Sequence, residues 1–477
     1  MKIKLIFPYA PLNVFGGFDS QESLKDKQKP RNWGRLLKSI SRIKPFDLAF
    51  KVSNPPLTLM ILAALTPPEA EVKLEDERIK PTDFEEAADL VGISVMTKAS
   101  ARAYEIAQAY RARKVKVIMG GVHPSFCPDE ALQYADAIII GEAEYIWPQI
   151  IRDFKEGKLK KVYRSEKWVD PKDIPAPRFD LIDPNDYFVA GVFQTTRGCP
   201  FNCDFCSVTT LYGRSYRCRP VENVVQEVKL FKNRLGKSAK RPLVFFVDDN
   251  IAGNPIYAKE LFRALIPLEI DWLSQSTINI ANDVELLKLA KKSGCAYLFI
   301  GFESFSKKVL QEMNKKVNRP ERYPEQVKKI KKEGIGIIGG FIFGFDSDDE
   351  ETIRDTTAFA IESRIDLAIF NTLTPDPGTP LYEKLKKENR ILFPEWWKKE
   401  HAEDVYLKHM DYIIKNPNHP VIIKGVTNAF RDFYALKSII KRMSDTKKGP
   451  FWTWSLLLNL AFYLKSKNIC KNIFSEL

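Results

Sequence analysis

The sequence predicts an α/β protein: a doubly wound Rossmann-like domain, then a partial (β/α)6 barrel, then a mainly helical C-terminal region. Short β-rich runs alternate with helical stretches from residue 2 to residue 154, and a second alternating series begins at Val192. Beyond about residue 385 only helix and loop patterns remain. Strands that alternate with helices favour parallel sheets covered by helices. A chain of 477 residues is also too long for one typical core.

The first expected domain covers residues 1–165, with an insertion at about 11–56 to which the pattern assigns no structure. Its expected strands are residues 2–7, 71–76, 89–94, 115–121 and 135–142, and its expected helices are 57–65, 84–88, 99–111, 128–134 and 146–154. Ligands of such folds bind beyond the carboxyl ends of the strands. The pair Gly120-Gly121 ends one strand and would let a ligand approach the backbone closely.

Residues 166–190 are rich in proline and aspartate and are interpreted as a linker. The barrel is expected over residues 191–385, with strands at 192–195, 243–247, 272–277, 297–301, 336–343 and 367–372. The active site of such a barrel lies at the carboxyl ends of its strands.

The C-terminal region, residues 386–477, contains an apolar stretch at 451–464. Its length of about fourteen residues is below the roughly twenty needed to span a bilayer. Its tryptophans and flanking lysines suit a helix at a membrane surface. A helix docked on the protein's own core explains the same pattern, and both interpretations stay open.

The composition indicates in which compartment the protein works and which partners it has. Three of the seven cysteines fall within eight residues, which favours metal ligation in a reducing compartment over disulfides. The N-terminus resembles no signal peptide, so a cytoplasmic location is expected, with membrane association on the cytoplasmic face as an option. The net charge is +13, but no basic stretch is interleaved with stacking aromatics, so no nucleic-acid partner is expected.

The chemistry-bearing motif is the spacing C-x3-C-x2-C formed by Cys199, Cys203 and Cys206, directly after the first barrel strand. Three thiolates in one loop can hold three irons of a [4Fe-4S] cubane and leave the fourth iron open to another molecule. The alternative is a zinc site, but such sites usually have four ligands. Cys218 is the one nearby candidate for a fourth ligand.

At these residues the chain resembles the radical S-adenosylmethionine (SAM) superfamily. The resemblance implies that the three cysteines ligate a [4Fe-4S] cluster whose open iron binds SAM, and that reductive cleavage yields a 5′-deoxyadenosyl radical. It also implies SAM contacts from further residues: Phe205, Asp248, Asp249, Gln275, Asn279 and Glu303. From the residues alone, capping of the following helix by the acidic pair at 248–249 is the alternative, but the position of the pair in the series of strands favours the cofactor.

The N-terminal domain extends the resemblance to the class that carries a cobalamin-binding domain, and within it to the hopanoid-methylase-like group. The matching segments are residues 54–57, 120–124, 141–144, 378–380 and 430–434. The implied cobalamin contacts are Thr97, Gly120, Gly121, His123 and Glu142. The D-x-H-x-x-G motif, whose histidine ligates cobalt from below, is absent. His123 lies in a different context, and a hydrogen-bonded loop histidine is the alternative interpretation.

The resemblance implies cobalamin-dependent methylation of an unactivated carbon of a lipid or other natural product. Two SAM molecules would be used, one as methyl donor to cobalamin and one as radical source. A flavodoxin or ferredoxin is the implied electron donor. Two alternatives stay open: a cobalamin-type cyclase or carbon-carbon coupling enzyme, and a non-catalytic corrinoid-binding protein.

Overall fold

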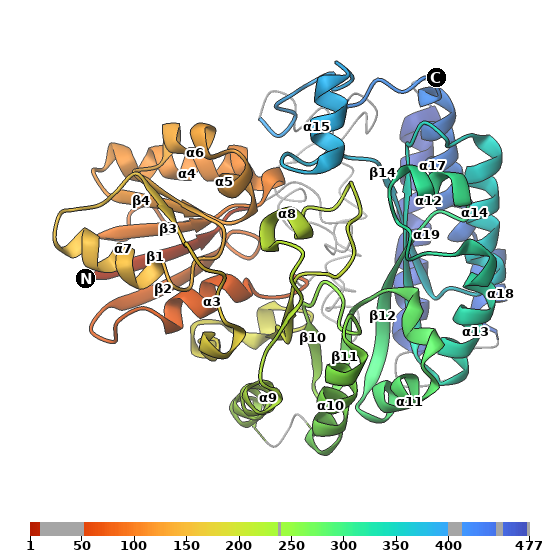
Figure 1. The fold of residues 1–477 in the computed structure, drawn as a ribbon, viewed down its shortest axis with the longest axis horizontal. Coiled ribbons are helices and arrows are strands. Elements are labelled where there is room, and N and C mark those ends of the chain that lie inside the picture. Colours follow the sequence, from red (N-terminus) through yellow and green to blue (C-terminus); the bar gives the residue numbers. More distant parts are fainter. Residues whose placement is uncertain (10–51, 237–239, 399–412, 445–451, 475–477) are drawn as a thin grey trace, which may run out of the picture. The chain divides into compact units, whose positions relative to one another are not determined.

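The computed structural model describes residues 1–9, 52–236, 240–398, 413–444 and 452–474. Most of the expected insertion at 11–56 therefore lies outside the described residues. The chain divides into two compact units, one of residues 1–193 with 397–406 and one of residues 194–396 with 407–477 (Figure 1). The domain boundaries expected from the sequence stay predictions.

The first unit contains a parallel six-stranded sheet with the order β2-β1-β3-β4-β5-β6. Its strands are β1 (Lys2–Phe7), β2 (Glu71–Asp76), β3 (Leu90–Ser94), β4 (Lys116–Gly120), β5 (Ala137–Ile140) and β6 (Val162–Arg164). Its helices are α3 (Leu57–Ala64), α4 (Ser100–Ala112), α5 (Val122–Phe126), α6 (Pro128–Tyr134) and α7 (Trp147–Lys155). The order in which strands are added to the sheet reverses between β1 and β3. Doubly wound folds bind ligands at such a switch point.

Each face of this sheet has its own hydrophobic cluster. Along β1, Ile3 and Leu5 pack with Trp147 of α7, whereas Ile6 packs with Ile106 of α4 on the opposite face. Neighbouring strand residues point to opposite faces, so a strand with apolar residues on both sides must be covered twice. The predicted doubly wound domain is confirmed.

One expected element was wrong: residues 84–88 form no helix, and only 84–86 are bends. The carbonyl groups of Asp83 and Phe84 accept hydrogen bonds from side chains of Lys4, Tyr110 and Arg113. A five-residue segment gains little from helix formation because nucleation is costly. These side-chain bonds satisfy the backbone instead.

A second six-stranded sheet has the order β14-β13-β12-β11-β10-β7, and its five strands from β10 to β14, all of the second unit, pair in parallel. Its strands are β7 (Gly191–Phe193), β10 (Leu243–Phe246), β11 (Asp271–Ser276), β12 (Cys295–Glu303), β13 (Gly336–Phe343) and β14 (Leu367–Thr372). The connecting helices are α9 (Val221–Leu235), α10 (Pro255–Leu265), α11 (Val284–Lys292), α12 (Lys307–Glu312), α13 (Tyr323–Lys332) and α14 (Glu350–Glu362). Strands that follow one another in sequence also lie side by side, as the predicted partial barrel requires.

The C-terminal region is helical as expected and includes α15 (Pro380–Lys387), α17 (His419–Phe433), α18 (Leu436–Met443) and α19 (Trp452–Phe474). Helix α19 is docked on the second unit. Its Asn459 side chain accepts from Arg442 at 2.7 Å and donates to the Asp366 carbonyl at 3.0 Å. No helix in the described part of the chain is long and apolar enough to cross a bilayer.

Candidate functional site

The three predicted cluster ligands lie in one loop of the second unit, directly after β8 (Thr196–Arg197). Strand β8 pairs with β9 (Arg217–Cys218) in a small antiparallel ladder. Gly198 begins the loop at φ +85°, and a Cβ there would lie 2.1 Å from the Ser215 carbonyl oxygen. Only glycine fits both the left-handed backbone and this close approach. The loop then turns away from β8 and carries the cysteines.

The loop is held from its far side by residues that follow α12. Asn314 donates from Nδ2 to the Asn202 carbonyl at 2.9 Å and to Asp204 Oδ1 at 3.0 Å. The Asp204 amide donates to the Met313 carbonyl at 3.2 Å. These bonds fix the loop that carries the cysteines against the segment after β12.

The thiols of Cys199, Cys203 and Cys206 are half-buried, free of disulfides and within electrostatic range of one another. Burial raises the pKa of Cys203 to about 11 and that of Cys206 to about 12. Iron–sulfur ligation needs thiolates, so binding a cluster here must expel protons.

Among the described residues, no three His, Cys, Asp or Glu side chains gather closely enough to hold a single metal ion. A zinc site would require such a group. A cubane distributes its thiolate ligands over three separate irons, so it needs no convergence on one point. Three thiolates in one loop are the donor set that a cubane with one open iron uses.

The two predicted acidic residues after β10 differ in role. Asp248 is fully buried, and its carboxylate accepts from the backbone and hydroxyl groups of Thr195 and Thr196. It therefore anchors the start of the cysteine loop. Asp249 accepts from the Gly198 amide at 3.3 Å, and its charge acts on the thiols of Cys199 and Cys206. Burial raises the pKa of Asp249 to about 6. Of the pair, Asp249 is the one placed beside the cysteines.

Glu303, predicted from the motif after the fourth strand, ends β12 in the left-handed region at φ +64°. Its carboxylate pairs with the buried ammonium of Lys315. Burial lowers the lysine pKa, but Glu303 and the Cys203 thiol outweigh that effect and raise it overall. A Cβ on Gly301 would lie 2.3 Å from Glu303 Oε1, which explains the glycine. Residues with a strained backbone, such as Glu303, cluster at functional sites.

Lys315 was not predicted from the sequence. Its ammonium lies 5.7 Å from the centre of the predicted Phe205 ring, and its charge acts on Cys203 and Cys206. The structure thus brings Phe205, Glu303, Lys315 and the cysteines together. The sequence shows only one lysine of a Lys-Lys pair, so no local signal marks it.

The remaining predicted SAM contacts lie at the end of β11. Gln275 is on the strand and half-buried, and its carbonyl accepts from the Ile251 amide at 2.9 Å. Asn279 follows in a short 3-10 helix (Ile278–Asn282), half-buried, with its side-chain oxygen 3.4 Å from Asn282 Nδ2. Both belong to the carboxyl end of the parallel sheet, as does Asp249.

In the first unit, the predicted residues also follow strand ends, but with different surroundings. Thr97 is buried just after β3. Gly121 has φ +106°, and a Cβ there would lie 2.9 Å from the Val95 carbonyl oxygen, whereas a Cβ on Gly120 would make only ordinary contact with Ile139. Glu142 is buried and accepts from the Val169 amide at 2.7 Å, so it holds the segment after β6.

His123 is fully buried, and its Nε2 lies 2.8 Å from the Tyr104 hydroxyl and 3.3 Å from Glu130 Oε1. Trp397 also donates to Glu130, at 3.0 Å. The Nδ1 atom of His123 has no hydrogen-bond partner among the described residues. The structure thus places His123, a residue of helix α5, in a buried hydrogen-bonded group, and its contact with cobalamin stays a prediction.

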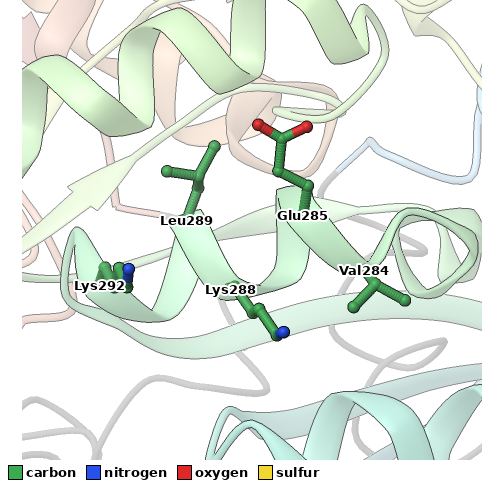
Figure 2. Close-up of a pocket in the computed structure, with 5 residues that line it drawn as sticks. All are labelled: Val284, Glu285, Lys288, Leu289 and Lys292. Atoms are coloured by element: carbon green, nitrogen blue, oxygen red, sulfur yellow. The ribbon is translucent and has the colours of Figure 1, made fainter.

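A surface hollow elsewhere on the second unit has no part in this arrangement. It lies along α11 and is lined by Val284, Glu285, Lys288, Leu289 and Lys292 (Figure 2). None of the predicted site residues lines it. Because one helix supplies the whole lining, the hollow lacks the convergent polar groups of a binding site.

Comparison with known proteins finds family matches in two different parts of the chain. Residues 193–360 match the model of the Radical SAM superfamily, and residues 49–151 match that of the B12 binding domain. The bacteriochlorophyllide d C-12(1)-methyltransferase of Chlorobaculum tepidum is 33% identical over 447 residues, which cover 92% of this chain and 95% of the relative. The chain belongs to the cobalamin-binding radical SAM methyltransferases.

Further relatives and solved structures match most of the chain. The hopanoid C-2 methylase of Rhodopseudomonas palustris is 30% identical, over 74% of this chain and 68% of the relative. Among solved structures, the radical SAM methyltransferase TsrM from Kitasatospora setae, with cobalamin and a [4Fe-4S] cluster bound, has a TM-score of 0.65 at 14% identity, covering 98% of this chain and 99% of that one. The cobalamin-dependent radical enzyme OxsB has a TM-score of 0.67 at 16% identity, covering 100% of this chain and 75% of that one. These two structures share the fold of this radical SAM enzyme.

Proposed function

We propose that this enzyme methylates an unactivated carbon of a lipid or other large apolar natural product. The observation that carries the proposal is the match to a carbon methyltransferase over nearly the whole chain, combined with an intact three-cysteine loop. Two relatives are named for the methylation of a bacteriochlorophyllide and of a hopanoid.

We further propose which residues hold the cofactors. Cys199, Cys203 and Cys206 would ligate a [4Fe-4S] cluster, and Asp249 with Glu303 would lie at the SAM site beside it. The carboxyl edge of the first sheet, around Thr97 and Gly121, would hold cobalamin. When bound, these groups supply radical generation and methyl carriage, chemistry that the protein's own side chains cannot perform.

The contribution of the chain itself is orientation and charge. Asp248 fixes the start of the cysteine loop through Thr195 and Thr196. Lys315 brings one positive charge next to Glu303 and the cysteines. A buried cation of this kind stabilises negative charge on nearby thiolates, because the effective dielectric constant there is below that of water.

The decisive experiment replaces each cluster ligand in turn. The variants are C199A, C203A and C206A, each reconstituted anaerobically with iron and sulfide. Each should hold fewer irons per chain than the four or so of one cubane, and none should form 5′-deoxyadenosine from SAM. Cys218→Ala is the matched control, because that thiol lies on β9 outside the loop. Normal 5′-deoxyadenosine formation in any of the three loop variants would contradict the assignment.

A second candidate is a cyclase on the same scaffold. The anaerobic magnesium-protoporphyrin IX monomethyl ester cyclase of Cereibacter sphaeroides is 25% identical over 68% of this chain. Incubation with SAM labelled at the methyl group separates the two. A methylase transfers the label to the substrate and releases S-adenosylhomocysteine, whereas a cyclase does neither.

We propose a cytoplasmic enzyme that receives electrons from a flavodoxin or ferredoxin, which a reduction assay with either donor would test. Contact of residues 451–464 with the cytoplasmic face of a membrane stays a prediction. Ser455 and Asn459, inside this stretch, are buried against the second unit, so one face of the helix is already occupied. Vesicle flotation of the full chain and of a chain that lacks residues 451–477 would test whether the other face of the helix contacts a membrane.

A further inference from the structure

Lys315 is a buried cation whose position is fixed by the backbone around it. Its side chain is 10% exposed, and its ammonium pairs with the Glu303 carboxylate. Its own amide donates to the Leu310 carbonyl at 2.9 Å, and its carbonyl accepts from the Asn318 amide at 3.2 Å. The ammonium packs closely over β12, since a Cβ on Gly301 would lie 2.9 Å from Lys315 Nζ. The charge is therefore held at one place inside the second unit.

The same segment holds the cysteine loop, so Lys315 lies beside the three predicted cluster ligands. The two residues before it bond to the loop at Asn202 and Asp204. Its ammonium lies 5.7 Å from the centre of the Phe205 ring, and Phe205 directly precedes Cys206. Its charge acts on all three thiols. Lys315 is thus fixed next to the loop in which a cluster would gain or lose an electron.

Negative charges act on the thiols of the same loop. Asp249 and Glu303 are the carboxylates involved from the ends of β10 and β12. Glu303 is also the partner of Lys315, so the ion pair places one charge of each sign near Cys203. The effective dielectric constant inside a protein is below that of water, so each charge acts more strongly here than at the surface. Removal of either partner leaves the charge of the other uncompensated.

The reduction potential of an iron–sulfur cluster depends on the charges around it. Reduction of a cubane adds one electron, taken from the reductant, and neither forms nor breaks a bond. A nearby cation stabilises this added negative charge and raises the midpoint potential, whereas a nearby carboxylate lowers it. The two partners of a buried ion pair beside the ligands therefore have opposing effects.

We propose that Lys315 and Glu303 shift the midpoint potential of the cluster in opposite directions, the ammonium raising it and the carboxylate lowering it. This inference rests on the proposed function, because it requires a [4Fe-4S] cluster on the three cysteines of the loop. Lys315 acts here through its charge alone, and no contact with SAM is required of it.

The test measures the midpoint potential of the reconstituted full-length protein without SAM, by anaerobic titration with dithionite and mediator dyes read by EPR. K315M removes the cation and should shift the midpoint to a more negative value. E303Q removes the carboxylate and should shift it to a more positive value. The double variant K315M/E303Q should lie between the two single variants. K315R keeps the charge and should keep the midpoint of the wild type.

K316M is the matched control, because Lys316 is adjacent and exposed, and solvent and salt screen its charge. Its midpoint should equal that of the wild type. Potentials are compared only between samples with about four irons per chain, the content of one cubane. K315Q, whose neutral amide can still donate to Glu303, serves if K315M does not hold the cluster.

The outcomes separate the inference from the function on which it rests. If the wild type holds no cluster after reconstitution, the proposed function fails. If it holds one, and the midpoints of K315M and E303Q equal that of the wild type or shift in the same direction, only the inference is overturned. Unchanged midpoints with weaker SAM binding would overturn it as well, because the pair would then serve SAM alone.

Discussion

Gly121 shows how one residue without a side chain shapes the carboxyl edge of the first sheet. Its φ of +106° is costly for any residue with a Cβ, and that Cβ would lie 2.9 Å from the Val95 carbonyl oxygen. Gly121→Ala should destabilise the protein by about 2 kcal/mol or more. The neighbouring Gly120→Ala meets only Ile139, at 3.5 Å or more, and should cost less than about 1 kcal/mol. Urea unfolding of the cofactor-free protein would measure both, and equal losses would contradict this account.

The ion pair between Lys315 and Glu303 leads to a second prediction, on the stability of the protein. Lys315→Met leaves the buried carboxylate of Glu303 without its cation, a change that typically costs about 3–5 kcal/mol. The double variant K315M/E303Q should recover part of this loss, because a neutral amide is cheaper to bury than a carboxylate.

The adjacent and exposed Lys316 provides the control for this pair, since K316M should change stability by about 0.5 kcal/mol or less. Denaturant midpoints of the three variants would decide. Equal effects of K315M and K316M would show that Lys315 and Glu303 are not paired in solution.

At the scale of elements, the loop after β13 has a pH-sensitive anchor. Asp348 is fully buried and accepts from the amides of Gly344 and Phe345 at 2.8 and 3.0 Å. Burial raises its pKa to about 7, and the Glu312 carboxylate adds to the effect. The folded state therefore holds this proton more tightly than the unfolded chain, where aspartate titrates near 4. The stability contributed by this group is present below pH 4 and is lost as the pH rises to 7.

Asp348→Asn removes this titration. Between pH 5 and pH 8, the unfolding free energy of the variant should rise by more than about 1 kcal/mol relative to that of the wild type. Unfolding free energies at several pH values would measure the slope. Asp355→Asn, on the exposed face of α14, reports the effect of the same exchange at the surface. Parallel wild-type and D348N profiles would contradict the assignment.

The elements also show what the sequence can and cannot predict. Strands β13 and β14 agree with the expected spans residue for residue, because long buried runs between turn residues carry a strong local signal. The two-residue strands β8 and β9 were not predicted, since they are defined by pairing with each other and not by any local pattern. The three cysteines were predicted from their spacing. Lys315 owes its position to contacts between distant segments, which one sequence does not reveal.

For the whole molecule, the first sheet lies in the first unit and the cysteine loop lies in the second, so the proposed cofactor sites use residues of different units. The triple variant C199A/C203A/C206A should therefore lose the cluster but keep its corrinoid, because the first sheet does not depend on iron. Gly121→Ala should show the reverse, with about four irons per chain and less cobalamin, because its strain lies at the carboxyl edge of the first sheet. Iron assay and the visible spectrum of the extracted corrinoid measure both contents on the same full-length samples. If the cysteine variant loses cobalamin as well, loading of the two sites is coupled, and the assignment of one cofactor to each unit would have to be replaced by a shared site.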